Sequence, residues 1–591
     1  MTRVLFSTVY DPEPLLERWA ATDQMAYRLT RGQGIFTLEE HAHSWPVHLL
    51  AQNIEADSVV LEWPSLEEFE AELRAADYDY VCISFMNRDL DKLPLMSAAV
   101  RRLRPGAKIV IGGYGVICLP DAEAARRTAD HDFICRSEGV HFLRQLLGEA
   151  DRPVQCRLPQ SGATLPWLAR RSRGTVGAAL AALGCTQKCP FCVTSFYTKG
   201  RLLEVLDVRG LYEAMLYYCD VNPFTSTVNV YDENFLDYKE RVDALGRLIR
   251  EDERYGLRHL NYFTFGSLSA ISRYDPEELL LNGLDTVWIG VESYFTRLKK
   301  TRGEDQQGKL DLDERNAFTV DTFRTLHSLG IKTIGSWIMG LDCQDRVNIS
   351  RDEDHFVRLD PTFQQISVLT VEPEMPIGKR YDVGGADARK FPWRNYHLYG
   401  QTFEPTEFTF GELLGRVEGL YRRMYQDLGP SLLRMLQCNL NGYHYCRRSR
   451  HPRLREDKAV FFERRVRSQA TILPAVAALG PNPGIRERAR ELDREVQELF
   501  GRPDEAQRVY RDHLMRKADA EYQARGEGER PIRTDAFRRY EYGPQSSSPR
   551  NRKPYVVSRT RLRGYETRRA GAPLPAASAP AAAVAAVAPI S

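Results

Sequence analysis

The chain has 591 residues, with 82 lysines and arginines against 80 aspartates and glutamates, a formal net charge of +2 and 43% hydrophobic residues. This length predicts three or four folded units, and the ordinary apolar fraction excludes a wholly disordered or fibrous protein. The balanced charge excludes a globally basic nucleic-acid binder. The 11 cysteines are too sparse for a disulfide-stapled secreted module.

Targeting signals are not evident in the sequence. The amino terminus meets charge and proline too early for the apolar core of a signal peptide. No window approaches the 18 or more apolar residues that a transmembrane helix needs. We therefore expect a cytoplasmic protein without a transmembrane segment, whose thiols are reduced, metal-bound or catalytic.

Short apolar runs alternate with helical patterns over residues 1–150, which predicts βαβ units and a doubly wound, mostly parallel sheet. The predicted strands are 4–9, 58–63, 80–85, 107–113 and 131–137. Ligands of such sheets bind outside the carboxyl ends of the strands. Gly112 and Gly113 follow one such end, Ser84 another, and Glu138 with Gly139 a third. No GxGxxG follows the first strand, so the fingerprint of a dinucleotide site is missing.

A polar stretch at 151–174 is predicted to be a linker, and a second strand–helix series fills 175–382. Its predicted strands are 175–184, 226–235, 260–267, 286–293, 331–340 and 364–373. Repeated strand–helix spacing over this length predicts a full or partial β/α barrel, with functional residues at the carboxyl ends of its strands.

The pattern changes after residue 382. Residues 383–524 are predicted to form an α-helical cap, and the Arg-, Pro-, Ser- and Ala-rich residues 525–591 to form a disordered tail. The basic stretch 550–569 could attract anionic lipid or nucleic acid, but a solvated tail without a specific partner is the favoured interpretation.

The most informative feature is a CxxxCxxC run, formed by Cys185, Cys189 and Cys192 directly after the first strand of the second series. A zinc site or three core thiols are the alternatives. Zinc requires a fourth ligand, and no further Cys or His stands nearby at finger spacing. Soft thiolates in a reducing compartment suit an iron–sulfur cluster. Three thiolates on a four-iron cluster leave one iron open for chemistry.

This cysteine run at the start of a β/α barrel resembles the radical S-adenosylmethionine (SAM) superfamily, and Phe191 matches the aromatic position of its CxxxCxΦC form. The resemblance implies a [4Fe-4S] cluster whose open iron binds SAM and whose electron cleaves it to a 5′-deoxyadenosyl radical. Later segments agree in order with family motifs: YDENF (231–235), NGLDTVWIGVES (282–293), GSWIMGLD (335–342) and, more loosely, VEPEMPIGKRY (371–381).

The resemblance also implies individual roles. The three cysteines are the cluster ligands, and Phe191 packs by the adenine. Asp232 lies where the family meets the methionine amino end of SAM. Glu292 and Ser293 would contact the ribose, and Gly340 would let the backbone approach the adenosine. The alternative for the acids is a turn or helix-cap role, and for Gly340 a simple turn.

Residues 1–150 resemble the cobalamin-binding domain that precedes the barrel in class B radical SAM proteins. The relevant segments read IVIGGYG and RSEGV where the family usually has VVLGG and RGEGE. The DxHxxG motif of other cobalamin proteins is absent, so the lower face of cobalamin would be held by other residues. The alternative is a degenerate domain that binds nothing.

These features favour a cobalamin-dependent radical SAM methyltransferase acting on an unactivated carbon of a small molecule or lipid. A cyclase, oxidative or ring-rearranging enzyme of pigment or natural-product synthesis is the first alternative, and a non-catalytic cobalamin or SAM sensor the second. An external flavodoxin or ferredoxin is the expected reductant, and no nucleic-acid partner is expected.

Overall fold

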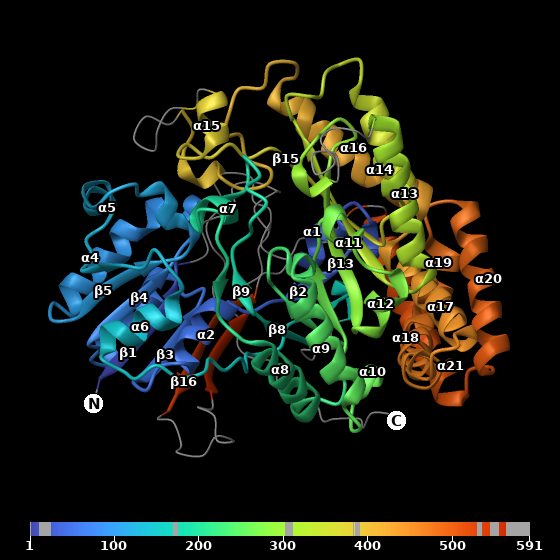
Figure 1. The fold of residues 1–591 in the computed structure, drawn as a ribbon, viewed down its shortest axis with the longest axis horizontal. Helices are drawn as coiled ribbons and strands as arrows, with labels where there is room; N and C mark the ends of the chain where they lie inside the picture. Colours follow the sequence, from blue (N-terminus) through green and yellow to red (C-terminus); the bar gives the residue numbers. More distant parts are fainter. Residues whose placement is uncertain are drawn as a thin grey trace.

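The computed structural model describes residues 2–10, 25–168, 175–301, 311–381, 383, 390–526, 528, 535–543 and 555–562. Figure 1 shows an amino-terminal sheet with its helices, a second sheet surrounded by helices, and a carboxyl-terminal group of helices. This mixed α/β architecture, with a Rossmann-like unit followed by a partial β/α barrel and a helical region, is the fold that the sequence predicts.

In the described residues the amino-terminal sheet has the strand order β17-β16-β3-β1-β4-β5-β6. Strands β3, β1, β4, β5 and β6 pair in parallel, which is the flavodoxin-like order. The strands are β1 (Arg3–Thr8), β3 (Asp57–Glu62), β4 (Tyr80–Ser84), β5 (Lys108–Gly112) and β6 (Phe133–Ile134), and the helices are α2 (Trp45–Gln52), α3 (Leu66–Ala75), α4 (Leu93–Leu103), α5 (Ala122–Thr128) and α6 (Gly139–Leu147).

Both faces of this sheet are buried, as the continuous apolar runs require. Leu5 of β1 belongs to a core cluster with Phe69 of α3 and Met96 of α4. Phe6 faces the other way and clusters with Val47 of α2 and Leu143 of α6. The sheet is therefore doubly wound, and only its strand ends are free to form a site.

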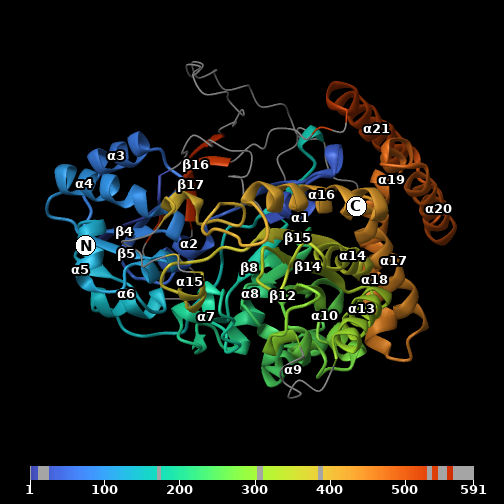
Figure 2. The same ribbon diagram turned by 90° about the horizontal axis from the view of Figure 1, so that it is seen from above.

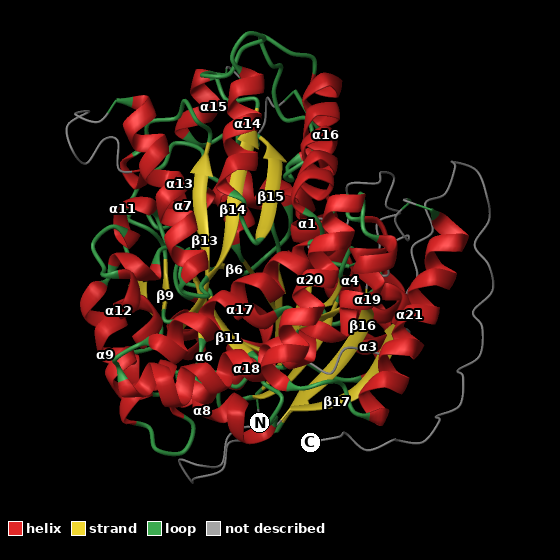
Figure 3. Cartoon of the chain, turned by 90° about the vertical axis from the view of Figure 1, so that its right-hand side faces the viewer, coloured by secondary structure: helices red, strands yellow, loops and turns green. Residues whose placement is uncertain are grey.

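The second sheet has the order β15-β14-β13-β12-β11-β8 in the part of the chain that is described, and all of its printed pairings are parallel. Figure 3 shows β13, β14 and β15 side by side, with helices packed around them. The strands are β8 (Val176–Ala179), β11 (Thr227–Val230), β12 (Tyr262–Phe265), β13 (Leu284–Glu292), β14 (Lys332–Met339) and β15 (Phe363–Val368). The helices between them are α7 (Val193–Tyr197), α8 (Val208–Val221), α9 (Lys239–Glu251), α10 (Gly256–His259), α11 (Leu268–Ile271), α12 (Pro276–Leu281), α13 (Leu312–Ser328), α14 (Ile349–Leu359) and, after β15, α15 (Pro376–Arg380).

Helix α1 (Met25–Thr30) lies against the face of this sheet opposite the core formed with its flanking helices. Its Leu29 clusters with Phe263, Trp288 and Ile334, one from each of three neighbouring strands. Helix α1 thus covers the aromatic side chains on this face of the second sheet. They form core contacts, as most aromatic residues do.

Short antiparallel strand pairs connect segments that are separated in the chain. Strand β2 (Glu39–His41) pairs with β7 (Gly162–Thr164), and β9 (Ala182–Leu183) with β10 (Leu203–Glu204). Strand β7 lies within the predicted linker, whose Cys156 is buried and donates to the carbonyl of Ala178 in β8. This connection is packed onto the second sheet.

The carboxyl-terminal region is helical, as predicted, and Figure 2 shows it on the side of the second sheet away from the amino-terminal domain. Its helices are α16 (Phe410–Leu428), α17 (Ser431–Arg448), α18 (Ala459–Gln469), α19 (Leu473–Leu479), α20 (Pro483–Phe500) and α21 (Glu505–Arg525). Among the described helices, none combines the length and apolar character needed to cross a bilayer.

The predicted disordered tail requires a correction. Residues Asp535–Tyr542 form strand β16, which pairs antiparallel with β3, and Tyr555–Leu562 form β17, which pairs with β16. The red strand β16 lies beside blue β3 in Figure 1, so a strand from the carboxyl-terminal part of the chain extends the amino-terminal sheet. Composition hid this strand because its arginines suggested solvation, whereas Tyr540 and Tyr542 are buried in the amino-terminal core. Residues 563–591 lie outside the described residues.

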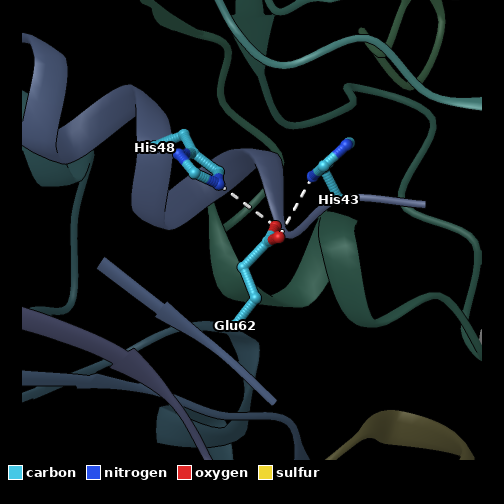
Figure 4. A group of neighbouring side chains, drawn as sticks. All are labelled: His43, His48 and Glu62. Atoms are coloured by element: carbon cyan, nitrogen blue, oxygen red, sulfur yellow. Dashed lines mark hydrogen bonds and ion pairs between the residues drawn. The ribbon is translucent and has the colours of Figure 1, made fainter. Parts of the chain in front are cut away.

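A buried polar cluster attaches β16 to the domain. His43 Nδ1 and His48 Nε2 lie 3.0 and 3.1 Å from the carboxylate oxygens of Glu62, and Figure 4 shows both rings directed at that carboxylate. Arg538 of β16 lies 3.2 Å from Glu62, and Tyr542 bonds His48 Nδ1 at 2.7 Å. Burial lowers the pKa of His43 to about 4, so Arg538 supplies the positive charge that balances Glu62.

Candidate active site

The cysteine loop follows β9 at the carboxyl end of the second sheet. Gly184 opens it with a φ of +107°, and a Cβ there would lie 2.2 Å from the carbonyl oxygen of Arg201, so only glycine fits. The backbone N–H of Cys192 bonds the carbonyl of Cys189 at 3.1 Å, and Cys192 then begins α7. Ser195 of α7 donates to the carbonyl of Cys185, which fixes the loop against the helix.

The three thiols are electrostatically coupled. Burial, which Lys300 opposes and to which Cys192, Glu292 and Cys185 add, raises the pKa of Cys189 to about 12. Burial also raises the pKa of Cys185, with contributions from Cys192 and Glu233. Thiols in such a setting become thiolates when a metal centre supplies positive charge. The donor set of three soft sulfurs on one short loop fits an iron–sulfur cluster.

Asp232 and Glu233 directly follow β11 and have different partners. Asp232 Oδ1 accepts the backbone N–H of Ala181 at 2.6 Å, and burial raises the pKa of Asp232 to about 7. Its Oδ2 is buried and has no hydrogen-bond partner among the described residues. A cationic amino group placed there would satisfy this oxygen.

Glu233 joins the cysteine loop to the amino-terminal domain. One oxygen accepts the N–H of Gly184 at 2.9 Å, and the other accepts the hydroxyl proton of Tyr114 at 2.6 Å. The Tyr114 ring meets Tyr197 of α7 edge-on at 5.2 Å, and Tyr197 donates to the carbonyl of Ser137. Figure 1 shows α7 between the two sheets. The loops after β5 and β6 therefore lie against the cysteine loop.

Glu292 ends β13 in a strained conformation with a φ of +70°, where the pairing register with β14 also shifts. Its carboxylate forms an ion pair with Lys300, whose Nζ lies 5.6 Å from the centroid of the Phe191 ring. A Cβ on Gly290 would lie 2.5 Å from both this carboxylate and this ammonium. Glu292 and Phe191 are thus brought to one place, with Lys300 between them.

Ser293 and Gly340 meet through a buried network. Ser293 donates to Asp352 at 2.8 Å, and Asp352 accepts from Gln344 at 2.5 Å. Gln344 Oε1 in turn accepts the N–H of Gly340 at 2.7 Å. Gly340 has a φ of +88°, so it also makes a turn that favours glycine. These contacts hold the ends of β13 and β14 together.

The expected cobalamin contacts lie at the carboxyl ends of β4, β5 and β6. Ser84 and Gly112 are register partners. Gly113 has a φ of +104°, and a Cβ on it would lie 2.5 Å from the carbonyl oxygen of Phe85. Glu138 accepts from Val140 and His141 as the cap of α6, while a Cβ on Gly139 would lie 2.8 Å from Leu50. Glu138 and Gly139 thereby have structural roles, and their contact with a cofactor stays a prediction.

A second polar pair spans the domains. Asn87, in the turn after β4, lies near enough to Glu372, which follows β15 in the VEPEMPIGKRY segment, to lower the pKa of its carboxyl. Burial raises the pKa of Glu372 to about 8, so this carboxyl is largely protonated at neutral pH. Asn87 Oδ1 and Glu372 Oε2 are buried acceptors without a partner in the described part of the chain. They offer hydrogen-bonding positions to a ligand with amide donors between the domains.

Sequence reasoning missed Lys300, Glu233 and Tyr114. Glu233 stands inside the YDENF motif, so the acid beside Asp232 was a signal that could have been used. Lys300 follows the IGVES motif by seven residues within a cationic run, and nothing in the sequence distinguishes it from its solvated neighbours.

No protein-family model and no curated protein matches the chain. Among solved structures, the chain is similar to TsrM from Kitasatospora setae, a radical S-adenosylmethionine methyltransferase. One TsrM structure, with a tryptophan substrate and the SAM analogue aza-SAM bound, is 14% identical and has a TM-score of 0.49; the match covers 79% of this chain and 100% of that one. Another, with cobalamin and a [4Fe-4S] cluster bound, is 13% identical with the same TM-score, over 80% of this chain and 100% of that one.

Proposed function

We propose that this chain is a cobalamin-dependent radical SAM enzyme and that its reaction is methyl transfer to an unactivated carbon of a small molecule or lipid. The observation that carries the proposal is the loop of Cys185, Cys189 and Cys192 at the carboxyl end of a parallel β/α sheet, against the ligand-binding edge of a flavodoxin-like domain. Such edges are where α/β sheets bind cofactors.

In this proposal the three cysteines hold a [4Fe-4S] cluster, which would supply the electron that cleaves SAM. The buried Oδ2 of Asp232 fits the amino group of SAM, because it lacks any other donor among the described residues. Cobalamin would lie at the ends of β4 and β5, with Asn87 and Glu372 as acceptors for its amide groups.

The chain's own contribution is positioning and exclusion of water. Glu233 ties the cysteine loop to Tyr114, so the two cofactor regions are held in one arrangement. The network of Ser293, Asp352 and Gln344 fixes the strand ends that face the reaction. A radical formed there would be enclosed by backbone that these bonds make rigid.

The proposal is tested by anaerobic reconstitution of the full chain with iron, sulfide and cobalamin, followed by SAM and a low-potential reductant. We expect 5′-deoxyadenosine and S-adenosylhomocysteine to form together. Deoxyadenosine without S-adenosylhomocysteine would replace methyl transfer by a cyclase or oxidative reaction. A complete cluster that yields neither product would favour a sensor.

A further inference from the structure

Lys300 has an unusual position for a lysine. Its side chain is 16% exposed, its Nζ is ion-paired with Glu292, and it lies over the face of Phe191, the residue before Cys192. Gly290 leaves the space that the ammonium and the carboxylate occupy. A lysine this buried is retained only where negative charge compensates its loss of hydration.

Glu292 supplies the compensating charge for Lys300. Burial by itself would lower the pKa of Lys300, but Glu292, Cys189 and Cys192 outweigh it and raise that pKa. The same interaction is visible from the sulfur side, where Lys300 is the group that lowers the pKa of Cys189. Glu292 keeps the ammonium charged, and the contact with the ring of Phe191 places this charge beside the cysteine loop.

Charge near an iron–sulfur cluster changes its reduction potential, because reduction adds an electron that a nearby cation stabilises and a nearby anion destabilises. In a buried site this effect is screened only weakly. The carboxylate of Glu292 and the ammonium of Lys300 place opposite charges next to each other at the strained carboxyl end of β13.

We propose that Lys300 is a positioning residue that holds a fixed positive charge beside the cysteine loop and raises the reduction potential of the cluster, with Glu292 as its counter-charge. This inference rests on the proposed function, because it requires that the loop bind an iron–sulfur cluster.

The test is a redox titration of the reconstituted cluster, monitored by electron paramagnetic resonance, in the wild-type chain and four variants. Lys300→Met should shift the midpoint to a more negative potential, and Lys300→Arg should restore it to nearly the wild-type value. At the wild-type midpoint we expect Lys300→Met to lower the ratio of reduced to oxidised cluster about tenfold, which equals about 59 mV for a one-electron couple. Glu292→Gln removes the counter-charge, so it should shift the midpoint in the positive direction.

The matched control is Lys332→Met. Lys332 is another buried lysine. Its partner Asp285 lies on β13, as Glu292 does, but at the amino end of that strand. This variant should lose stability and keep the wild-type potential. An unchanged midpoint in both Lys300→Met and Glu292→Gln would overturn the inference. If Lys300→Met does not fold, Glu292→Gln decides alone. Absence of any cluster in the wild-type chain would instead overturn the proposed function, so the two failures are distinguishable.

Discussion

Each end of β13 has a buried acid paired with a lysine, but the surroundings of the two ion pairs differ. At the amino end, Asp285 is paired with Lys332, which also donates to Asn439 of α17 at 2.9 Å; here β13 pairs regularly with β14, while its register with β12 shifts. At the carboxyl end, Glu292 has a positive φ beside a register shift, and its partner Lys300 faces the cysteine loop. A buried acid–lysine pair therefore does not identify a functional site. What distinguishes the carboxyl end is the positive φ of Glu292 and the nearby cysteine loop.

The amino end shows what a structural pair requires. Burial would raise the pKa of Asp285, but Lys332, Arg465 and Lys458 surround it and hold that pKa below its usual range. Each group is enclosed by the helical region that covers this end of the sheet. At the carboxyl ends of the sheet's strands the set of partners is less complete, since Asp232, which follows β11, keeps one carboxylate oxygen without a partner among the described residues.

The largest contrast between the two ends should appear with cysteine variants. Cys185→Ala is expected to abolish the iron–sulfur absorbance and reduce bound iron to background, because two thiolates do not retain a four-iron cluster. Cys438→Ala is the control, since Cys438 is a buried thiol near Lys332 and Asp285. It should keep full iron content. A normal cluster in Cys185→Ala would show that the cysteine loop is not the ligand set.

The next contrast is in stability. Asp285→Ala leaves Lys332 buried without its acid, and breaking such a pair costs about 3–5 kcal/mol. We expect a clear drop in the urea midpoint. Glu292→Ala should cost less, because Lys300 is more exposed than Lys332 and Cys189 and Cys192 remain near it. Equal losses of stability in Asp285→Ala and Glu292→Ala would mean that both ion pairs contribute only to folding.

A third buried pair, Glu62 with Arg538, extends the comparison to the amino-terminal domain. Arg538→Met should lower the melting temperature, because it leaves the buried carboxylate of Glu62 without its arginine partner. Truncation after residue 534 should lower it further, since β3 then loses its antiparallel partner. Arg127→Met, in an exposed i,i+4 pair with Glu123 of α5, is the control and should change little. An unchanged melting temperature in the truncated chain would show that β16 contributes nothing to the domain.

These contrasts also show what the sequence could predict. Apolar runs located the strands of both parallel sheets, because buried parallel strands need uninterrupted side chains on both faces. The spacing of Cys185, Cys189 and Cys192 predicted the candidate site, because ligands held on one loop are close in sequence; their role as cluster ligands stays a prediction. The ion pairs of Lys300 and Arg538 could not be predicted, because only folding brings their partners near. Long-range ion pairs leave no periodic signal.

A further expected effect is a pH dependence of stability at the amino end of β13. Burial lowers the pKa of Lys458 to about 7, against 10.5 for an ordinary lysine. Between these values the unfolded chain binds more protons than the folded chain, so stability should rise with pH from about 7 to 10, by at most about 1.4 kcal/mol per unit. Lys458→Met should remove this component, which the difference between the two melting-temperature profiles measures. Parallel profiles would contradict the assignment.

The central claim is that the cysteine loop binds a four-iron cluster with an open iron for SAM. The most direct measurement is electron paramagnetic resonance of the anaerobically reconstituted and reduced full chain, recorded with and without SAM and paired with iron analysis. The account predicts about four irons per chain, in line with a [4Fe-4S] site, and a spectrum that changes when SAM is added. One zinc per chain, or a cluster spectrum that SAM leaves unchanged, would contradict it.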